Sequence, residues 1–322
     1  MVNRSESTEQ HPATPSPRAA DLHVVEPSGR TADDPREHRV PARAGTLPVP
    51  LRAVLDGRLV LLKGGMAHLG AWEPLQRQVR AALDEHLPHG PAAGRPLEEL
   101  HRHADTALTV RLRTDLETRI RPLARAMLRD FTAALTPQPG RMYLSDHFGV
   151  RIMPPRSSIA PGSAPDGLAG FLTPRDAHVD SWFNTPVNSI NLWIALTRVE
   201  RGNGLLFHPD AYRSTLRHDG WDLLPGQDVG DPVDVAMDAQ DVLLFAGDHL
   251  HASQPNDTDA TRIVLTKRLC LGPPRYPRHG TGWVPYDDPR LSGTPWEPLA
   301  SWRSRLTAAG LRHALRTVTG HR

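Results

Sequence analysis

The chain has 322 residues, of which 39% are hydrophobic and 23% charged, and its formal net charge is +2. This length suits one catalytic domain with extensions, and the apolar share is large enough to build a core. No stretch approaches the ~18 apolar residues of a membrane span, and the first residues lack the apolar segment of a secretory signal. Acidic residues nearly balance the arginines, and no segment interleaves basic with aromatic residues, so we expect neither a membrane nor a nucleic-acid partner.

Residue usage bears on the compartment and on the class of site. The single cysteine, Cys270, excludes a disulfide framework and a cysteine zinc cage. It fits a reducing compartment, so we expect a cytoplasmic protein. Of the 38 basic residues only Lys63 and Lys267 are lysines, and there are 32 prolines, a composition typical of a GC-rich bacterial genome. The sequence does not indicate an oligomeric state.

The first half of the chain predicts a tail followed by helices. Residues 1–48 are rich in Pro, Ser, Arg, Asp and Glu without a sustained period, which predicts a disordered tail. Val54–Lys63 predicts a short strand that begins with an Asp-Gly turn. Apolar residues at helical spacing predict one helix over Trp72–Leu87 and another over Leu108–Leu135, which Pro122 kinks or splits.

From residue 141 onward short apolar runs alternate with turn signals. They predict many short strands, typical of a sandwich or barrel, followed by a helical C-terminal extension over residues 271–322. We expect one domain over residues 49–322, with its helical part at about 72–136 and its β core at about 141–270. The predicted strands are Arg141–Met153, Ala177–Phe183, Ser189–Thr197, Gly204–Phe207, Val233–Ala236, Asp241–Phe245, Leu250–Ser253 and Arg262–Leu269.

His178 and Asp180 are candidate metal ligands. On a strand, residues i and i+2 project to the same face, so these two side chains would reach one ion, and His251 could supply a third ligand from across the barrel. Two histidines and one carboxylate form the facial triad of non-haem Fe(II) oxygenases, which leaves three positions open. His-x-Asp is weak evidence alone, because it also occurs at His103–Asp105 and His208–Asp210. His249 is a rival to His251, since the two would share a strand face.

The segment after His251 suggests an anion site beside the metal. Ser253 lies on the same predicted strand face as His251, and Arg262 alternates with Val264 and Thr266 on the next strand. A guanidinium that lines the barrel interior needs an anion. A carboxylate beside a serine hydroxyl meets that need, and 2-oxoglutarate would supply it while its keto-acid end reaches the metal.

The ordered set of motifs resembles the phytanoyl-CoA dioxygenase-like (PhyH) family of Fe(II)/2-oxoglutarate-dependent oxygenases, of the bacterial secondary-metabolism type. The set comprises His178-x-Asp180, the NLWIAL segment, the ERGNG turn, and His251-x-Ser253 followed by Arg262. The resemblance covers roughly residues 54–269. It implies a double-stranded β-helix (jelly-roll) core with helices packed on one sheet. By position it implies three iron ligands (His178, Asp180, His251), two 2-oxoglutarate ligands (Arg262, Ser253), and Trp193 near the co-substrate.

Two segments depart from the family pattern. The chain reads His208-Pro209-Asp210 where the family often has Pro-Gly-Ser-His, and Gln240-Asp241 where it has a Gly-Asp turn. Neither position carries iron chemistry. In related halogenases Ala or Gly replaces the carboxylate, so Asp180 argues against halogenation.

The resemblance implies hydroxylation of an unactivated C–H bond, or oxidative cyclisation or desaturation, of a small-molecule substrate. A polar natural-product intermediate, as in antibiotic biosynthesis, is the expected substrate class. A fatty acyl-CoA fits less well, because no cationic cluster for its phosphates stands out in the sequence. Arg151, Asn184 and Arg213 are candidate substrate contacts. Two alternatives stay open: a metal-dependent jelly-roll enzyme that does not use 2-oxoglutarate, and a non-catalytic β-sandwich binding protein.

Overall fold

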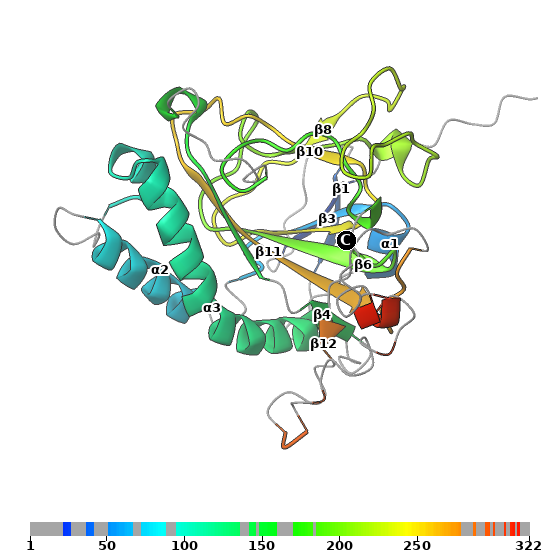
Figure 1. Cartoon of the computed structure of the whole chain (residues 1–322), viewed down its shortest axis with the longest axis horizontal. Coiled ribbons are helices and arrows are strands. Elements are labelled where there is room, and N and C mark those ends of the chain that lie inside the picture. Colours follow the sequence, from blue (N-terminus) through cyan, green and yellow to red (C-terminus); the bar gives the residue numbers. More distant parts are fainter. Residues whose placement is uncertain are drawn as a thin grey trace, which may run out of the picture.

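The structure of the chain is a computed structural model (Figure 1). It describes residues 22–26, 37–41, 51–66, 72–87, 95–135, 142–145, 148–159, 170–182, 185–277, 286–287 and a few positions between 294 and 315. The predicted C-terminal helical extension falls largely outside these residues, as does the end of the predicted strand Ala177–Phe183.

The helices come early in the chain. They are α1 (Leu51–Leu55), α2 (Trp72–His86) and α3 (Thr106–Leu135). α2 and α3 pack against each other on one side of the molecule, whereas α1 lies on the other side, against β6 (Ser189–Ala195) and β9 (Val242–Ala246) (Figure 1). The helix predicted from Trp72 is thus confirmed. Pro122 lies inside α3, which stays one helix but changes direction along its length, so the proline kinks it without splitting it. Within the described residues, no helix is both long and apolar enough to cross a membrane.

The strands of the described residues form two sheets, and nearly all pairs in the central part are antiparallel. The larger sheet has nine strands in the order β12-β4-β11-β6-β9-β3-β1-β2, with β5 also paired to β11. The smaller has the order β10-β7-β8. The strand bounds are β1 Leu22–Glu26, β2 Glu37–Pro41, β3 Leu59–Leu62, β4 Met142–Ser145, β5 Gly149–Met153, β6 Ser189–Ala195, β7 Leu205–Phe207, β8 Val233–Asp234, β9 Val242–Ala246, β10 His251–Ser253, β11 Arg262–Leu271 and β12 Tyr286–Asp287.

Three expectations differ from this layout. The predicted strand Arg141–Met153 is divided into β4 and β5. The predicted tail 1–48 contains β1 and β2, which run parallel to each other, and β1 pairs with β3. The prediction of a strand over Ala177–Phe183 is wrong for its described part: His178 makes one isolated bridge to His251, and Asp180–Trp182 is a turn of 3-10 helix.

The large sheet has two faces of opposite character, because side chains alternate along each strand. On β11, Ile263, Leu265 and Leu269 belong to an apolar core shared with α2 and α3. The intervening residues face the smaller sheet, where Val264 joins a second apolar cluster that includes Phe207 of β7. β6 repeats the pattern: its residues 190, 192 and 194 lie on the helix side. The mainly antiparallel two-sheet architecture, with helices on one sheet, confirms the predicted mainly β fold class.

Candidate metal centre

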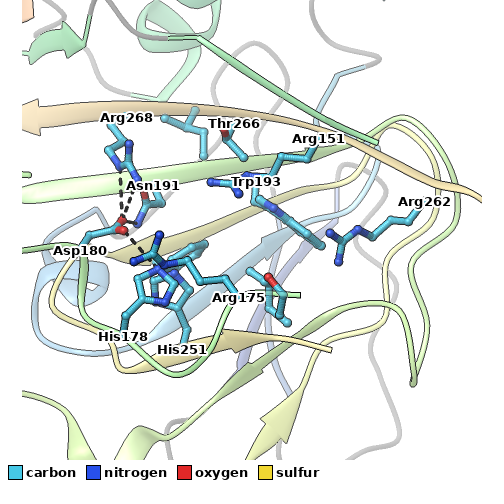
Figure 2. Close-up of a pocket in the computed structure, with 14 residues that line it drawn as sticks. Arg151, Arg175, His178, Asp180, Asn191, Trp193, His251, Arg262, Thr266 and Arg268 are labelled. Carbon is cyan, nitrogen blue, oxygen red and sulfur yellow. Dashed lines mark hydrogen bonds and ion pairs between the residues drawn. The ribbon is translucent and has the colours of Figure 1, made fainter. Parts of the chain in front are cut away.

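A pocket lies between the two sheets, on the face of the large sheet that is turned away from the helices (Figure 2). It contains about 460 Å³ of empty space, including its open mouth. β5, β6 and β11 line one side, and β10 with the segment before Asp180 lines the other. Its lining residues are Arg151, Arg175, His178, Asp180, Asn191, Leu192, Trp193, Leu205, Phe245, His251, Ser253, Arg262, Thr266 and Arg268.

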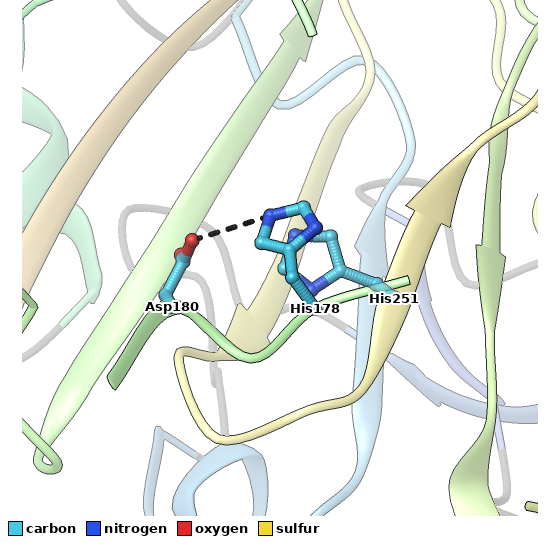
Figure 3. A group of neighbouring side chains, drawn as sticks. All are labelled: His178, Asp180 and His251. Atoms are coloured by element: carbon cyan, nitrogen blue, oxygen red, sulfur yellow. Dashed lines mark ion pairs between the residues drawn. The ribbon is translucent and has the colours of Figure 1, made fainter. Parts of the chain in front are cut away.

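The three predicted ligands converge in this pocket (Figure 3). One ligand atom from each of His178, Asp180 and His251 lies within 4.8 Å of the other two, and all three residues are buried. The histidine rings are 4.4 Å apart between centroids. His178 Nε2 is 3.7 Å from Asp180 Oδ1. Two imidazoles and a carboxylate at this separation suit a divalent transition metal such as iron(II).

The His-x-Asp pair meets for a different reason than the sequence predicts. The backbones of His178 and His251 exchange two hydrogen bonds of 3.0 Å, which fixes the two histidines side by side. The chain then turns out of the sheet, and Asp180 N donates to Gly247 O at 3.0 Å. At Gly247 an added Cβ would lie 2.4 Å from Ser189 Oγ, so a side chain here would displace the Ser189 hydroxyl. A turn, and not strand alternation, therefore directs Asp180 toward the histidines.

Both histidine rings are oriented so that Nε2 points to the position where the three ligand atoms converge. His178 Nδ1 lies 2.8 Å from Asp176 O, and His251 Nδ1 lies 2.9 Å from His249 O. A carbonyl only accepts, so each Nδ1 carries the proton and each Nε2 keeps its lone pair for a metal. Burial lowers the pKa of His178 to about 3 and also lowers that of His251. Both rings are therefore neutral near pH 7, as metal ligands must be.

Asp180 is oriented by two neighbours from the large sheet. Its Oδ2 accepts hydrogen bonds from Asn191 Nδ2 at 2.8 Å and from Arg268 Nη2 at 3.1 Å. Burial alone would raise the pKa of this carboxyl, but the charge of Arg268 and the hydrogen bond from Asn191 hold it below its usual value. Asp180 is therefore ionised, and its Oδ1 faces the histidines.

His249 does not share the ligand position. Its Nε2 lies 2.8 Å from Gly57 O, so this nitrogen donates away from the pocket. The ring packs against Tyr212, with centroids 4.8 Å apart. His249 is outside the one group of candidate ligands found among the described residues. The geometry thus favours His251 over its rival.

Arg262 lies at the other end of the pocket, past Trp193 (Figure 2). Its side chain is fully buried, and its guanidinium lies 5.3 Å from the centre of the Trp193 ring. Nη1 donates to the carbonyls of Asn203 and Gly204 at 2.5 and 3.2 Å, whereas Nε and Nη2 have no hydrogen-bond partner. A buried cation with two free N–H groups calls for an anion, and a carboxylate matches the guanidinium geometry. Ser253 also lines the pocket.

Of the three predicted substrate contacts, one lines the pocket, one does not, and one lies outside the described residues. Arg151 lines the pocket. Arg213 is absent from the lining: its backbone φ is +57°, its guanidinium lies over the Tyr212 ring, and Nε is 3.5 Å from Asp248 Oδ2. Asn184 lies outside the described residues.

Sequence reasoning missed Arg268 and Arg175. Arg268 shares the parity of Arg262 along β11, so strand alternation alone would have placed it in the pocket. Arg175 comes from the irregular segment before His178, for which no periodic signal exists.

The match to a known protein family falls on the segment that contains the candidate ligands. Residues 168–264 match the model of the family described as phytanoyl-CoA dioxygenase (PhyH). This segment contains the three candidate ligands together with Ser253 and Arg262. The predicted resemblance to a family of Fe(II)/2-oxoglutarate-dependent enzymes is confirmed over this segment. No curated protein sequence matches the chain.

Several solved structures are distantly similar. The non-haem α-ketoglutarate-dependent epimerase SnoN from nogalamycin biosynthesis is 18% identical over 68% of this chain and 82% of its own, with a TM-score of 0.39. The carbocyclase SnoK from the same biosynthesis is 15% identical over 72% and 90%, with a TM-score of 0.40. EvdO2 from Micromonospora carbonacea var. aurantiaca, solved with 2-oxoglutarate, is 16% identical over 71% and 92%, with a TM-score of 0.40.

Proposed function

We propose that the chain is an Fe(II)/2-oxoglutarate-dependent oxygenase. It would hydroxylate, or oxidatively cyclise or desaturate, an unactivated C–H bond of a small polar metabolite in natural-product biosynthesis. The observation that carries the proposal is the convergence of His178, Asp180 and His251 in one pocket with the buried, half-satisfied guanidinium of Arg262. The family match over residues 168–264 supports it independently.

Each residue has a defined task in this proposal. His178, His251 and Asp180 would hold Fe(II), with their orientation fixed by backbone carbonyls, Asn191 and Arg268. Three protein ligands leave coordination positions for 2-oxoglutarate and O2. When bound, iron and 2-oxoglutarate supply the oxidising chemistry, with succinate and CO2 as co-products. The protein contributes ligand geometry, orientation and a largely buried site.

Arg262 and Ser253 would bind the distal carboxylate of 2-oxoglutarate. The two free N–H groups of Arg262 face the pocket side of β11, and Trp193 lies against the guanidinium. The burial of Arg262 counts against a jelly-roll enzyme that uses the metal alone, because such an enzyme has no use for an unpaired buried cation. The convergence of three neutral or anionic ligands counts against a non-catalytic β-sandwich whose histidines are incidental.

Anaerobic loading of the full chain with Fe(II) and 2-oxoglutarate tests the proposal. The wild type is expected to develop the visible charge-transfer absorption of iron-bound 2-oxoglutarate and, on exposure to O2, to release succinate. His178→Ala should lose both signals, because one of only three protein ligands is removed. His103→Ala is the matched control, since His103 is exposed and belongs to another His-x-Asp pair. Equal signals from His178→Ala and the wild type would refute the ligand assignment.

A further inference from the structure

We propose that the substrate carries an anionic group, a carboxylate or a phosphate, that the Arg151 guanidinium binds inside the pocket. This inference rests on the proposed function and specifies its substrate class. It starts from the unusual charge content of the pocket lining, which contains four arginines and a single carboxylate.

Three of the four arginines already have counter-charges or a role. Arg268 pairs with Asp180 at 3.1 Å, and Arg175 pairs with Asp222 at 3.4 Å. Arg262 is the proposed partner of the 2-oxoglutarate carboxylate. Even with iron and dianionic 2-oxoglutarate bound, positive charges would outnumber negative ones in the pocket. Of the four lining arginines, Arg151 is the one to which no counter-charge or role has been assigned so far.

Arg151 is placed to face a ligand. It lies on β5 in register with Val264 of β11, and Val150 and Ile152 on either side belong to the apolar core beneath the sheet. Alternation therefore directs Arg151 to the pocket side, where it is one of the lining residues (Figure 2). Among the described residues no carboxylate forms an ion pair with it. Its hydrogen bond to protein goes to the backbone carbonyl of Gly170.

The electrostatic surroundings of Arg151 favour an added anion. Burial, followed by repulsion from Arg268, lowers the pKa of Arg151 to about 10. Burial and repulsion from Arg151 lower the pKa of Arg262 to about 9. An anion between or beside these guanidiniums would relieve both the desolvation and the repulsion, and a planar carboxylate or a phosphate accepts two N–H bonds from one arginine.

A purely structural role for Arg151 is the competing explanation. Its guanidinium lies 4.9 Å from the centre of the Phe171 ring, and the ring is also covered by Arg113 at 4.2 Å. Together with the bond to Gly170, this contact anchors the segment that leads into His178. Phe171→Leu removes the ring contact but keeps the guanidinium, so it separates anchoring from anion binding.

Anion titration of the loaded protein tests the inference. The full chain is saturated with Mn(II), an O2-stable substitute for iron, and with 2-oxoglutarate, which occupies the Arg262 end. Acetate and methyl phosphate, as carboxylate and phosphate probes, are then titrated by calorimetry. We expect one-to-one binding of at least one probe to the wild type, and the tighter probe identifies the group. Arg151→Gln should weaken it at least tenfold, whereas Phe171→Leu and the exposed Arg156→Gln should stay within threefold.

Three outcomes would overturn the inference. The first is that neither probe binds the loaded wild type. The second is that Phe171→Leu weakens the probe as much as Arg151→Gln does. The third is that Arg151→Gln lowers 2-oxoglutarate affinity as much as Arg262→Gln, which would make Arg151 a co-substrate ligand. Failure of the proposed function is seen separately, because Fe(II) and 2-oxoglutarate would then give no charge-transfer absorption in the wild type.

Discussion

The two faces of the large sheet use the same strands for opposite purposes. Toward α2 and α3, the side chains of β5, β6 and β11 are mainly aliphatic and form one continuous core, with Lys267 over the Phe148 ring as the charged exception. Toward the smaller sheet, the same strands present Arg151, Asn191, Arg262 and Arg268 to the pocket. Strand alternation with a period of two residues is enough to separate them. Substitution of a helix-side residue should therefore affect the stability of the fold, whereas substitution of its neighbour on the same strand should affect ligand binding.

The free energy of burial has opposite signs on the two faces of the sheet. Each aliphatic side chain on the helix side gains free energy when it leaves water, by roughly 1.5–3 kcal/mol for a fully buried Leu or Ile. Each buried charge on the pocket side has a desolvation cost that only a partner offsets. Asp180 and Arg268 compensate each other, whereas Arg262 has no ionic partner among the described residues. The helix side therefore stabilises the fold, whereas the pocket side contains buried charges for which a bound ligand would be the partner.

The largest expected effect is on the helix side. Leu265→Ala should lower the free energy of unfolding by about 2–5 kcal/mol, because Leu265 is fully buried in the apolar core and its loss leaves a cavity. Urea unfolding of the metal-free protein measures this, and the folded fraction should still bind metal. Thr266→Ala, one residue further on β11 and turned toward the pocket, is the control. If Thr266→Ala lowered the free energy of unfolding as much as Leu265→Ala, the assignment of different purposes to the two faces of the sheet would be contradicted.

A second pair of variants separates support of the metal site from support of the fold. Asn191→Ala removes a hydrogen bond to Asp180 and should weaken metal binding by roughly 10- to 100-fold, the usual effect of losing an outer partner of a metal ligand. Asn188→Ala is the matched control, a buried asparagine that instead donates to Leu271 O and Pro273 O. It should lower stability and leave metal affinity within about twofold of wild type. Metal titration and thermal unfolding measure both quantities, and equal metal affinities of the two variants would refute the assigned role of Asn191.

Strand alternation explains how much of this arrangement the sequence could predict. The apolar run that contains Arg262 predicts a buried strand, and alternation with Val264 and Thr266 predicts that this arginine lies on the same strand face as those two residues. The helix from Trp72 and most of the short strands follow from the same periodicities. Arg268 was within reach, since it has the parity of Arg262.

The rest depends on contacts that local patterns do not contain. Asp180 reaches the histidines through a turn held by a backbone hydrogen bond to Gly247 O, which is far along the chain. The four pocket arginines come from β5, β11 and the segment before His178, so no cluster of cations stands out in the sequence. The backbone at Gln240 is also visible only in the structure: its φ of +81° lies in the left-handed region that favours glycine.

The smallest expected effect has the opposite sign from the first. Arg262→Met should make the metal-free, co-substrate-free protein more stable, by about 1 kcal/mol, although it lies next to core residue Ile263. Two N–H groups of the buried guanidinium lack partners, so removing the charge should gain more than the loss of the bonds to Asn203 O and Gly204 O costs. The same substitution should abolish the further rise in melting temperature that 2-oxoglutarate gives the metal-loaded wild type, because a bound ligand stabilises only the state it binds. Thermal unfolding of the metal-free protein, and of the metal-loaded protein with and without 2-oxoglutarate, measures this, and Arg156→Met at an exposed position should change neither value. A variant that is less stable when unliganded, yet still stabilised by 2-oxoglutarate, would show that Arg262 belongs to the scaffold and not to the site.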